Sequence, residues 1–116
     1  MPVLVAVRDL LLRSRIHAAA ERLGIPVRLA PRGTPLSEAA HALGRGTVIA
    51  DLSEPGTLDQ IRAAKRVGDV RVVGFLGHLE EDLARAASEA GVDEVLSRGR
   101  FMRRLDGLLR ESASAP

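Results

Sequence analysis

Short apolar runs alternate with segments of helical periodicity along the whole chain. The apolar runs are rich in Val, Leu and Ile, as strands buried on both faces should be. Between them, apolar residues recur three and four positions apart, which places them on one face of a helix. The pattern predicts strands at residues 3–7, 27–29, 47–50, 70–75 and 94–96. It predicts helices at residues 10–23, 35–43, 57–67, 80–90 and 101–110.

Helix-capping residues stand near the ends of these segments. Asp9 precedes the first helix, where its carboxylate can accept a hydrogen bond from an unpaired backbone N–H. Thr34 and Pro35 are expected to open the second helix as its cap and its first residue. Residues 57–60, Thr-Leu-Asp-Gln, resemble a capping box at the start of the third. Glycines follow several of the helices and are expected to end them.

Five βα units in succession predict an α/β fold, with a parallel sheet and helices on both faces. We expect one domain over residues 1–111 and a frayed tail over residues 112–116. Ligands bind such sheets at the carboxyl ends of the strands. The residues at those ends are Arg8, Asp9, Asp51, Gly77, His78 and Arg98. We name Arg8, Gly77, His78 and Arg98 the strand-end cleft, and they form no glycine-rich phosphate loop.

The amino-acid composition excludes several kinds of chemical site. The chain has no Cys, which excludes disulfides, thiolate-bound zinc and thiol catalysis. It has no Trp or Tyr and only two Phe, so the core must be aliphatic and bases have little to stack on. No apolar run approaches the about 18–20 residues that a membrane span needs, and the N-terminus lacks the basic start of a signal peptide. We expect a cytoplasmic protein with no membrane partner.

The net charge of +2 accompanies a pI of about 10.3. The chain contains one Lys, sixteen Arg and no Tyr or Cys, so almost no side chain loses a proton at moderately alkaline pH. A small positive charge therefore persists to high pH. The high pI reflects these missing groups and does not indicate a strong positive field. Nucleic acid is therefore not a favoured partner. The charge is unevenly spread, because residues 1–34 sum to +4, residues 35–97 to −5 and residues 98–116 to +3.

The two basic ends are expected to meet on one face, since the first and last helices of such a fold share a face of the sheet. The arginines that would form a docking face there are Arg13, Arg15, Arg100, Arg103 and Arg104. An acidic protein partner or a second copy of the chain would suit this face. The alternative is that the arginine stems cover the helices while their charged heads are solvated.

The strand-end residues resemble the receiver domain of two-component response regulators. Asp9 follows the first strand, Asp51 ends the third, and residues 51–56, Asp-Leu-Ser-Glu-Pro-Gly, are similar to the phosphoacceptor turn of that family. The resemblance implies a flavodoxin-like (βα)5 three-layer sandwich with strand order 2-1-3-4-5. It also implies that Asp51 is the phosphoacceptor. Mg²⁺ would then be held by Asp9 and Asp51 to offset the charge of the phosphoryl group.

The sequence departs from that family at several positions. Arg8 stands where the resemblance implies a second acid, and the fourth strand is followed by Gly77 and His78 instead of a hydroxyl-bearing residue. Arg98 takes the place of a lysine, and the fifth strand has no aromatic residue. An arginine beside the remaining acid opposes Mg²⁺, so any metal site is weak. We expect Asp51 to form a salt bridge with Arg8 or Arg98 instead.

Three functions follow from these observations. The favoured one is a stand-alone receiver-like signalling or protein-interaction module, not phosphorylated in the usual way and without catalytic activity. The second is a single-domain response regulator phosphorylated at Asp51 with Mg²⁺. The third is a small-molecule or nucleotide-binding protein, or an enzyme, that uses the strand-end cleft, although no acid–base pair supports it. The partner, the input signal and the oligomeric state are not encoded in any recognisable motif.

Overall fold

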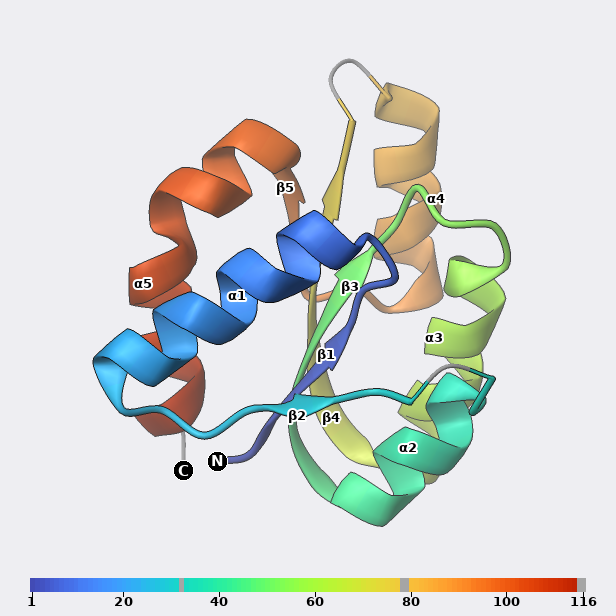
Figure 1. Ribbon diagram of the computed structural model, residues 1–116. Helices are drawn as coiled ribbons and strands as arrows, with labels where there is room; N and C mark the ends of the chain where they lie inside the picture. The colour runs from blue at the N-terminus through green and yellow to red at the C-terminus, as the bar shows by residue number, and fades with distance from the viewer. Residues whose placement is uncertain (32, 78–79, 115–116) are drawn as a thin grey trace.

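The computed structural model describes residues 1–31, 33–77 and 80–114, over which strands and helices alternate (Figure 1). The strands are β1 (Val3–Ala6), β2 (Arg28–Leu29), β3 (Arg45–Asp51), β4 (Asp69–Leu76) and β5 (Glu94–Ser97). The helices are α1 (Leu10–Leu23), α2 (Leu36–Leu43), α3 (Thr57–Val67), α4 (Glu81–Ala90) and α5 (Arg98–Ser114). The strands pair in parallel in the order β2-β1-β3-β4-β5. The expected flavodoxin-like (βα)5 sandwich is confirmed.

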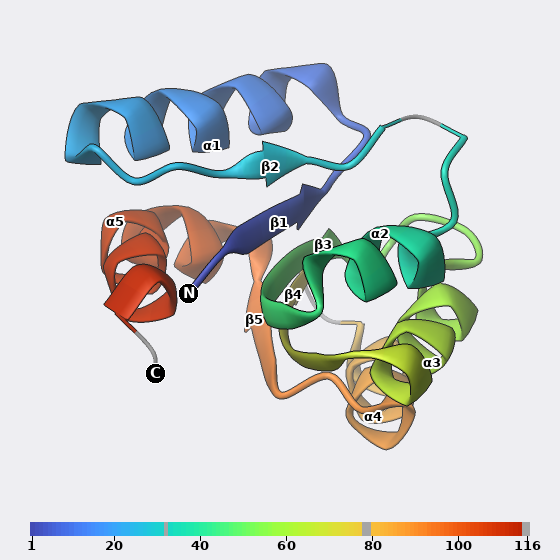
Figure 2. The ribbon, with the colours of Figure 1, turned by 90° about the horizontal axis from the view of Figure 1, so that it is seen from below.

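Two layers of helices enclose the sheet, as Figure 2 shows. Helices α1 and α5 pack on one face, and α2, α3 and α4 pack on the other. Successive side chains of a strand point to opposite faces. Val3 and Val5 of β1 therefore join the α1–α5 core, while Leu4 between them joins the other core. Because both faces are covered, residues 47–50 of β3 and 72–76 of β4 are buried without interruption, and charged residues stand at the strand ends.

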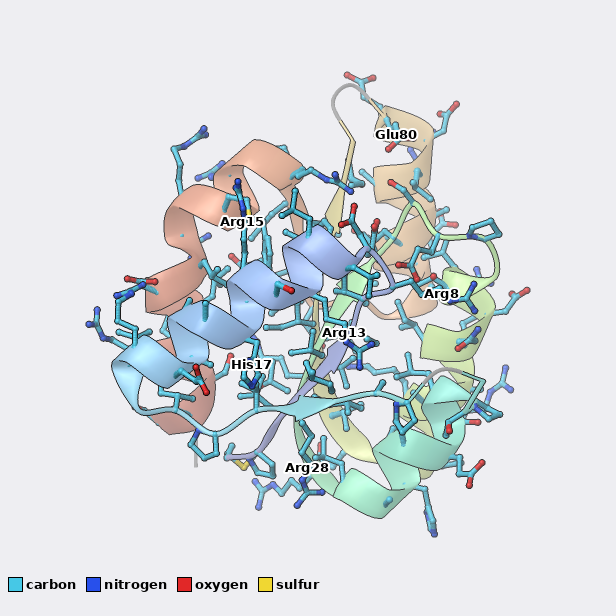
Figure 3. The ribbon with its side chains drawn as sticks, viewed as in Figure 1. Arg8, Arg13, Arg15, His17, Arg28 and Glu80 are labelled. Carbon is cyan, nitrogen blue, oxygen red and sulfur yellow. The ribbon has the colours of Figure 1, made fainter. Side chains whose placement is uncertain are left out.

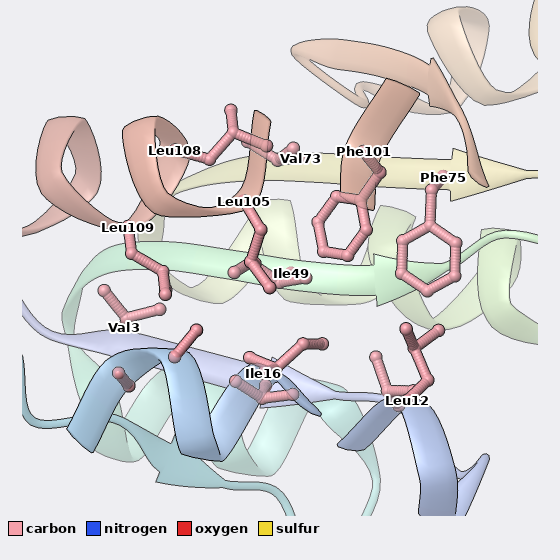
Figure 4. Packing of buried hydrophobic residues seen from close by; sticks show 14 of the residues in the cluster. Val3, Leu12, Ile16, Ile49, Val73, Phe75, Phe101, Leu105, Leu108 and Leu109 are labelled. Carbon is pink, nitrogen blue, oxygen red and sulfur yellow. The ribbon is translucent and has the colours of Figure 1, made fainter. Parts of the chain in front are cut away.

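The core beneath α1 and α5 holds both aromatic side chains of the protein. Phe75 of β4 and Phe101 of α5 stack with their ring centroids 4.5 Å apart (Figure 4). The rings lie among aliphatic side chains from the two helices and the sheet, including Leu12, Ile16, Ile49, Leu105 and Leu109. Phe75 is also the residue that pairs with Asp51 in the β3–β4 ladder. The apolar core thus reaches the carboxyl end of the sheet.

A glycine on β4 determines how the chain leaves β3. The N–H of Leu52 donates to the carbonyl of Phe75 over 2.8 Å, which extends the ladder beyond Asp51. The buried side chain of Leu52 packs over Gly74, where an added Cβ would lie 2.6 Å from Leu52 Cδ2. Only a residue without a side chain leaves room for Leu52 there. The path of the turn after Asp51 therefore depends on Gly74.

Two helices begin differently from what the sequence predicts. Helix α2 starts at Leu36 with Pro35 as its N-cap residue, because Pro35 is still extended at ψ 141°, and Thr34 does not cap the helix. Helix α3 starts after Gly56, whose φ of 79° lies in the left-handed region that favours glycine. No side chain caps α3, so the capping box expected at residues 57–60 does not form.

Helix α5 is longer at both ends than the periodicity predicts. It begins at Arg98, directly after β5, and it runs to Ser114. Residues 112–114, which we expected to fray, continue the helix, and the Met1 ammonium donates to the Ala113 carbonyl over 2.8 Å. Even so, neither α5 nor any other helix in the described part of the chain is long and apolar enough to cross a membrane. How the chain divides into domains stays a prediction.

Candidate functional site

Asp51, the candidate phosphoacceptor, is a buried carboxylate at the end of β3. The residue is only 5% exposed. Its Oδ1 accepts a hydrogen bond from the N–H of Ser53 over 3.0 Å, and its Oδ2 lies 3.5 Å from Nη2 of Arg98. A carboxylate withdrawn from water needs partners of this kind to stay charged. Of the two salt bridges that the sequence left open, the structure has the one with Arg98.

Arg98 reaches Asp51 from the start of α5, on the far side of β4. Its guanidinium carbon lies 5.9 Å from the centroid of the Phe75 ring, close enough for a cation–π contact. Phe75 is itself held in place by its stack on Phe101. The Phe75 ring therefore forms an apolar surface against which the Arg98 guanidinium lies while it contacts the Asp51 carboxylate. The side chain of Arg98 remains 52% exposed, so its outer face is open to solvent.

Arg8, at the end of β1, turns toward Glu54 instead of Asp51. The backbone N–H of Arg8 donates to Glu54 Oε1 over 2.7 Å, and Nε of Arg8 lies 3.9 Å from Oε2. The side chain of Arg8 is 68% exposed, so this ion pair is weak. Sequence reasoning missed Glu54, and the only signal for it was an acidic residue in the turn after a strand end.

Asp9 has a structural role as the N-cap of α1. Its Oδ1 accepts from the N–H of Leu12 over 3.1 Å, which confirms the predicted cap. Among the residues that the structure describes, no group of three or more His, Asp or Glu side chains is placed to hold a metal ion. Asp51 already has a cation beside it in Arg98. The donor set fits Mg²⁺ poorly, and a weak site at Asp9 and Asp51 stays a prediction.

The described residues of the strand-end cleft do not come together in one site. Arg8 turns to Glu54, while Arg98 turns to Asp51. Gly77 donates its N–H to Oε2 of Glu80 over 2.8 Å, so the Gly77 backbone is bound to the residue that precedes α4. His78, the remaining member, lies outside the described residues.

The arginines expected to form one docking face point in different directions. Arg13 and Arg15 leave α1 on different sides, as Figure 3 shows. Arg13 turns toward the end of β1, where its Nη1 donates to the carbonyl of Val7 over 3.3 Å. Arg15 is exposed and points toward α5. Arg13 therefore does not share a surface with Arg15, although both were predicted to lie on the same face.

The arginines of α5 also differ from one another. Nη1 of Arg104 donates to Oε1 of Glu94 in β5 over 2.7 Å, and Arg71 of β4 contacts the other oxygen over 3.1 Å. The hydrogen bond from Arg104, together with the charges of both arginines, holds the pKa of Glu94 below its ordinary value. Arg100 and Arg103 are exposed. Arg104 thus joins α5 to the edge of the sheet, while the other two remain accessible.

The chain matches no protein-family model and no curated protein. Solved structures match it over nearly its whole length. A response regulator from Hahella chejuensis has a TM-score of 0.78 and 15% identity, with 98% of this chain and 96% of that chain covered. The receiver domain of a sensor histidine kinase from Pseudomonas aeruginosa, with a magnesium ion coordinated in the active site cleft, has a TM-score of 0.73 and 17% identity, with 98% of each chain covered.

A third match is to a longer chain. A response regulator from Burkholderia pseudomallei, with a phosphorylated aspartic acid, a calcium ion and citrate, has a TM-score of 0.76 and 19% identity. The alignment covers 98% of this chain and 66% of that one. At these identities the likeness establishes the fold. The chain therefore has the fold of response regulator receiver domains, as its strand-end residues suggested.

Proposed function

We propose that this chain is a receiver-like signalling or protein-interaction module that is not phosphorylated at Asp51 in the usual way. The observation that carries the proposal is the ion pair between Asp51 and Arg98, at 3.5 Å. It places a cation against an oxygen that a phosphoacceptor would use for attack or for binding a metal ion. The module catalyses no reaction and acts in the cytoplasm through a protein partner or a second copy.

The electrostatics of phosphoryl transfer support this reading. Attack by a carboxylate on a phosphoryl group brings two anions together, so cations must be placed where the charge develops. Arg8 faces Glu54, with 3.9 Å between Nε and Oε2, and Asp9 caps α1. Arg8 carries no carboxylate, and one carboxylate oxygen of Asp9 is already bound to the N–H of Leu12. Instead, the negative charge of Asp51 is paired with Arg98, the first residue of α5.

The competing function is a response regulator phosphorylated at Asp51, with Mg²⁺ held by Asp9 and Asp51. One observation favours it. The side chain of Arg98 is 52% exposed, so it has room to move from the carboxylate and grip a phosphoryl oxygen. The two functions differ in a single covalent event at Asp51, and they can be separated by a direct chemical assay.

The assay incubates the whole chain with Mg²⁺ and acetyl phosphate and follows its intact mass. Asp51→Asn is the matched control, because it keeps the shape of the side chain and removes the nucleophile. We expect wild type and the variant to behave alike, with no gain of a phosphoryl group. A stoichiometric gain in the wild type that the variant lacks would overturn the proposal in favour of the response regulator.

A further inference from the structure

A second concave site lies at the carboxyl ends of β1 and β2, next to the starts of α2 and α3. The cavity is small, with a volume of about 60 Å³, and it is partly open to solvent. Neither Asp51 nor Arg98 is among its lining residues. It lies beside β1, one strand from the edge of the sheet, at the carboxyl ends of the strands, where open parallel sheets bind ligands. Arg8 and its partner Glu54 do line this cavity.

Two arginines line the cavity from one side. Arg8 ends β1, and Arg13 lies one turn into α1, with its side chain directed back toward the start of that helix. The bond from Nη1 of Arg13 to the carbonyl of Val7, at 3.3 Å, fixes this guanidinium at the cavity wall. Both arginine side chains belong to the lining of this one cavity. Guanidinium groups placed together in this way suit an oxyanion.

Polar groups from the opposite wall add hydrogen-bond donors. Thr34 and Thr57 contribute hydroxyl groups to the lining. The side-chain oxygen of Gln60 accepts from the N–H of Leu36 over 3.3 Å, which leaves the amide N–H₂ as the group that Gln60 can offer a ligand. Leu36 and Thr57 are the first residues of α2 and α3, so the positive ends of both helix dipoles adjoin the arginines.

Glu54 is the acidic residue among the described lining residues, and it sets a limit on affinity. It accepts the backbone N–H of Arg8 and lies 3.9 Å from Nε of the same residue. That long contact on an exposed side chain is readily exchanged for a better one. An incoming anion would replace Glu54 on the Arg8 guanidinium while Glu54 keeps its bond to the backbone.

We propose that this cavity binds a small molecule carrying a phosphate or carboxylate group, with the anionic group held between Arg8 and Arg13. The remainder of the lining includes Ala30, Pro31 and Pro55, which suits a short apolar or hydroxylated body. A phosphate monoester and a dicarboxylate share the chemistry that the arginines recognise. Because Arg8 is exposed to solvent, binding weakens as the salt concentration rises.

Amide NMR titration of the 116-residue chain tests the site, with inorganic phosphate and malonate as separate probes. At least one probe should give saturable shifts in the amides of Arg8, Leu36 and Thr57. Arg8→Gln and Arg13→Gln should each weaken binding about tenfold, the loss expected for one charge-assisted hydrogen bond. The stronger of the two probes identifies whether the natural ligand carries a phosphate or a carboxylate.

Three further variants keep the result interpretable. Glu54→Gln removes the competing carboxylate and should tighten binding, a change that damage to the fold cannot produce. Arg85→Gln, on exposed α4, removes the same charge far from the cavity and should leave affinity unchanged. Asp51→Asn should also bind normally, so this site stands or falls separately from the proposed signalling function. Equal affinity in wild type, R8Q and E54Q, or shifts that never saturate with either probe, would overturn the assignment.

Discussion

The guanidinium of Arg98 lies 3.5 Å from the carboxylate of Asp51, and it joins the start of α5 to the end of β3. The two partners differ in environment, since the carboxylate side chain is 6% exposed and the guanidinium side chain is 52% exposed. Losing Arg98 would therefore leave a buried charge whose remaining hydrogen-bond donor, among the residues that the structure describes, is the N–H of Ser53. The pair is part of the fold as well as the feature that distinguishes the candidate site.

Removing Arg98 should lower stability measurably. We expect Arg98→Gln to reduce the free energy of unfolding by ~1–2 kcal/mol at neutral pH, between the values typical of exposed and buried ion pairs. Urea denaturation measures the change. Arg100→Gln removes an exposed arginine two residues away and should have little effect. If Asp51→Asn does not reduce the cost of R98Q, the two residues are not energetically coupled.

Glu94 should make the protein sensitive to acid. Its pKa is lowered in the fold from an ordinary value of 4.5, chiefly by the hydrogen bond from Arg104. A carboxyl whose pKa falls on folding stabilises the native state above the unfolded pKa, and this contribution is lost as the pH falls through the lower folded pKa. Glu94→Gln should therefore cost stability at pH 7, about 1 kcal/mol, and much less once the pH is below the folded pKa. A pH-independent cost in urea denaturation would contradict the ion-pair assignment.

Gly74 should be intolerant of even a methyl group. An added Cβ would lie 2.6 Å from Leu52 Cδ2, so Gly74→Ala must displace a buried side chain and is expected to cost ~1–3 kcal/mol. Gly107 gives the matched control, because it lies inside α5 and no neighbouring atom of the described residues comes within 4 Å of an added Cβ. Gly107→Ala should stabilise the protein by about 0.5–1 kcal/mol. Thermal or urea denaturation that ranks the two variants the other way would refute the packing argument.

The proposed docking face should depend on arginines that remain exposed. Arg15 and Arg103 meet this condition, whereas Arg104 is bound to Glu94. Charge reversal at both exposed positions, R15E with R103E, should weaken association with an acidic partner or a second copy, and more strongly at low salt. Partner pull-down and sedimentation velocity measure the two cases. Arg85→Glu, on α4, is the control, and a double variant that leaves both readouts unchanged argues for simple solvation of the arginines.

The sequence contains enough to predict the fold but not the pairing of its charges. Strand and helix assignments depend on local periodicity, which a buried parallel sheet makes strong. The choice between Arg8 and Arg98 as the partner of Asp51 depends on where α5 begins, and the periodicity placed that start three residues too late. Likewise, Arg13 was assigned to the docking face because a helical wheel does not show that its guanidinium turns to the carbonyl of Val7.

The sequence pattern also does not predict contacts between the two ends of the chain. The Met1 ammonium binds the carbonyl of Ala113, a contact between residues 112 positions apart. The helical spacing of apolar residues predicts an end at residue 110, so it predicts fraying for residues 112–114. Helix caps failed for a related reason: whether Thr34 or Pro35 precedes the first helical residue depends on how the chain enters α2 from the sheet.

The central claim is that Asp51 does not respond to a phosphoryl group, and beryllofluoride with Mg²⁺ tests it most directly. This anion occupies the place of a phosphoryl group on a carboxylate without a covalent reaction. The amide spectrum of wild type is compared with that of Asp51→Asn and of the double variant R8D/R98K, which restores the acid and the lysine that the receiver pattern implies. We predict that the Ser53 and Gly77 amides of wild type do not shift, as in D51N. Saturable shifts in wild type that D51N abolishes would contradict the account.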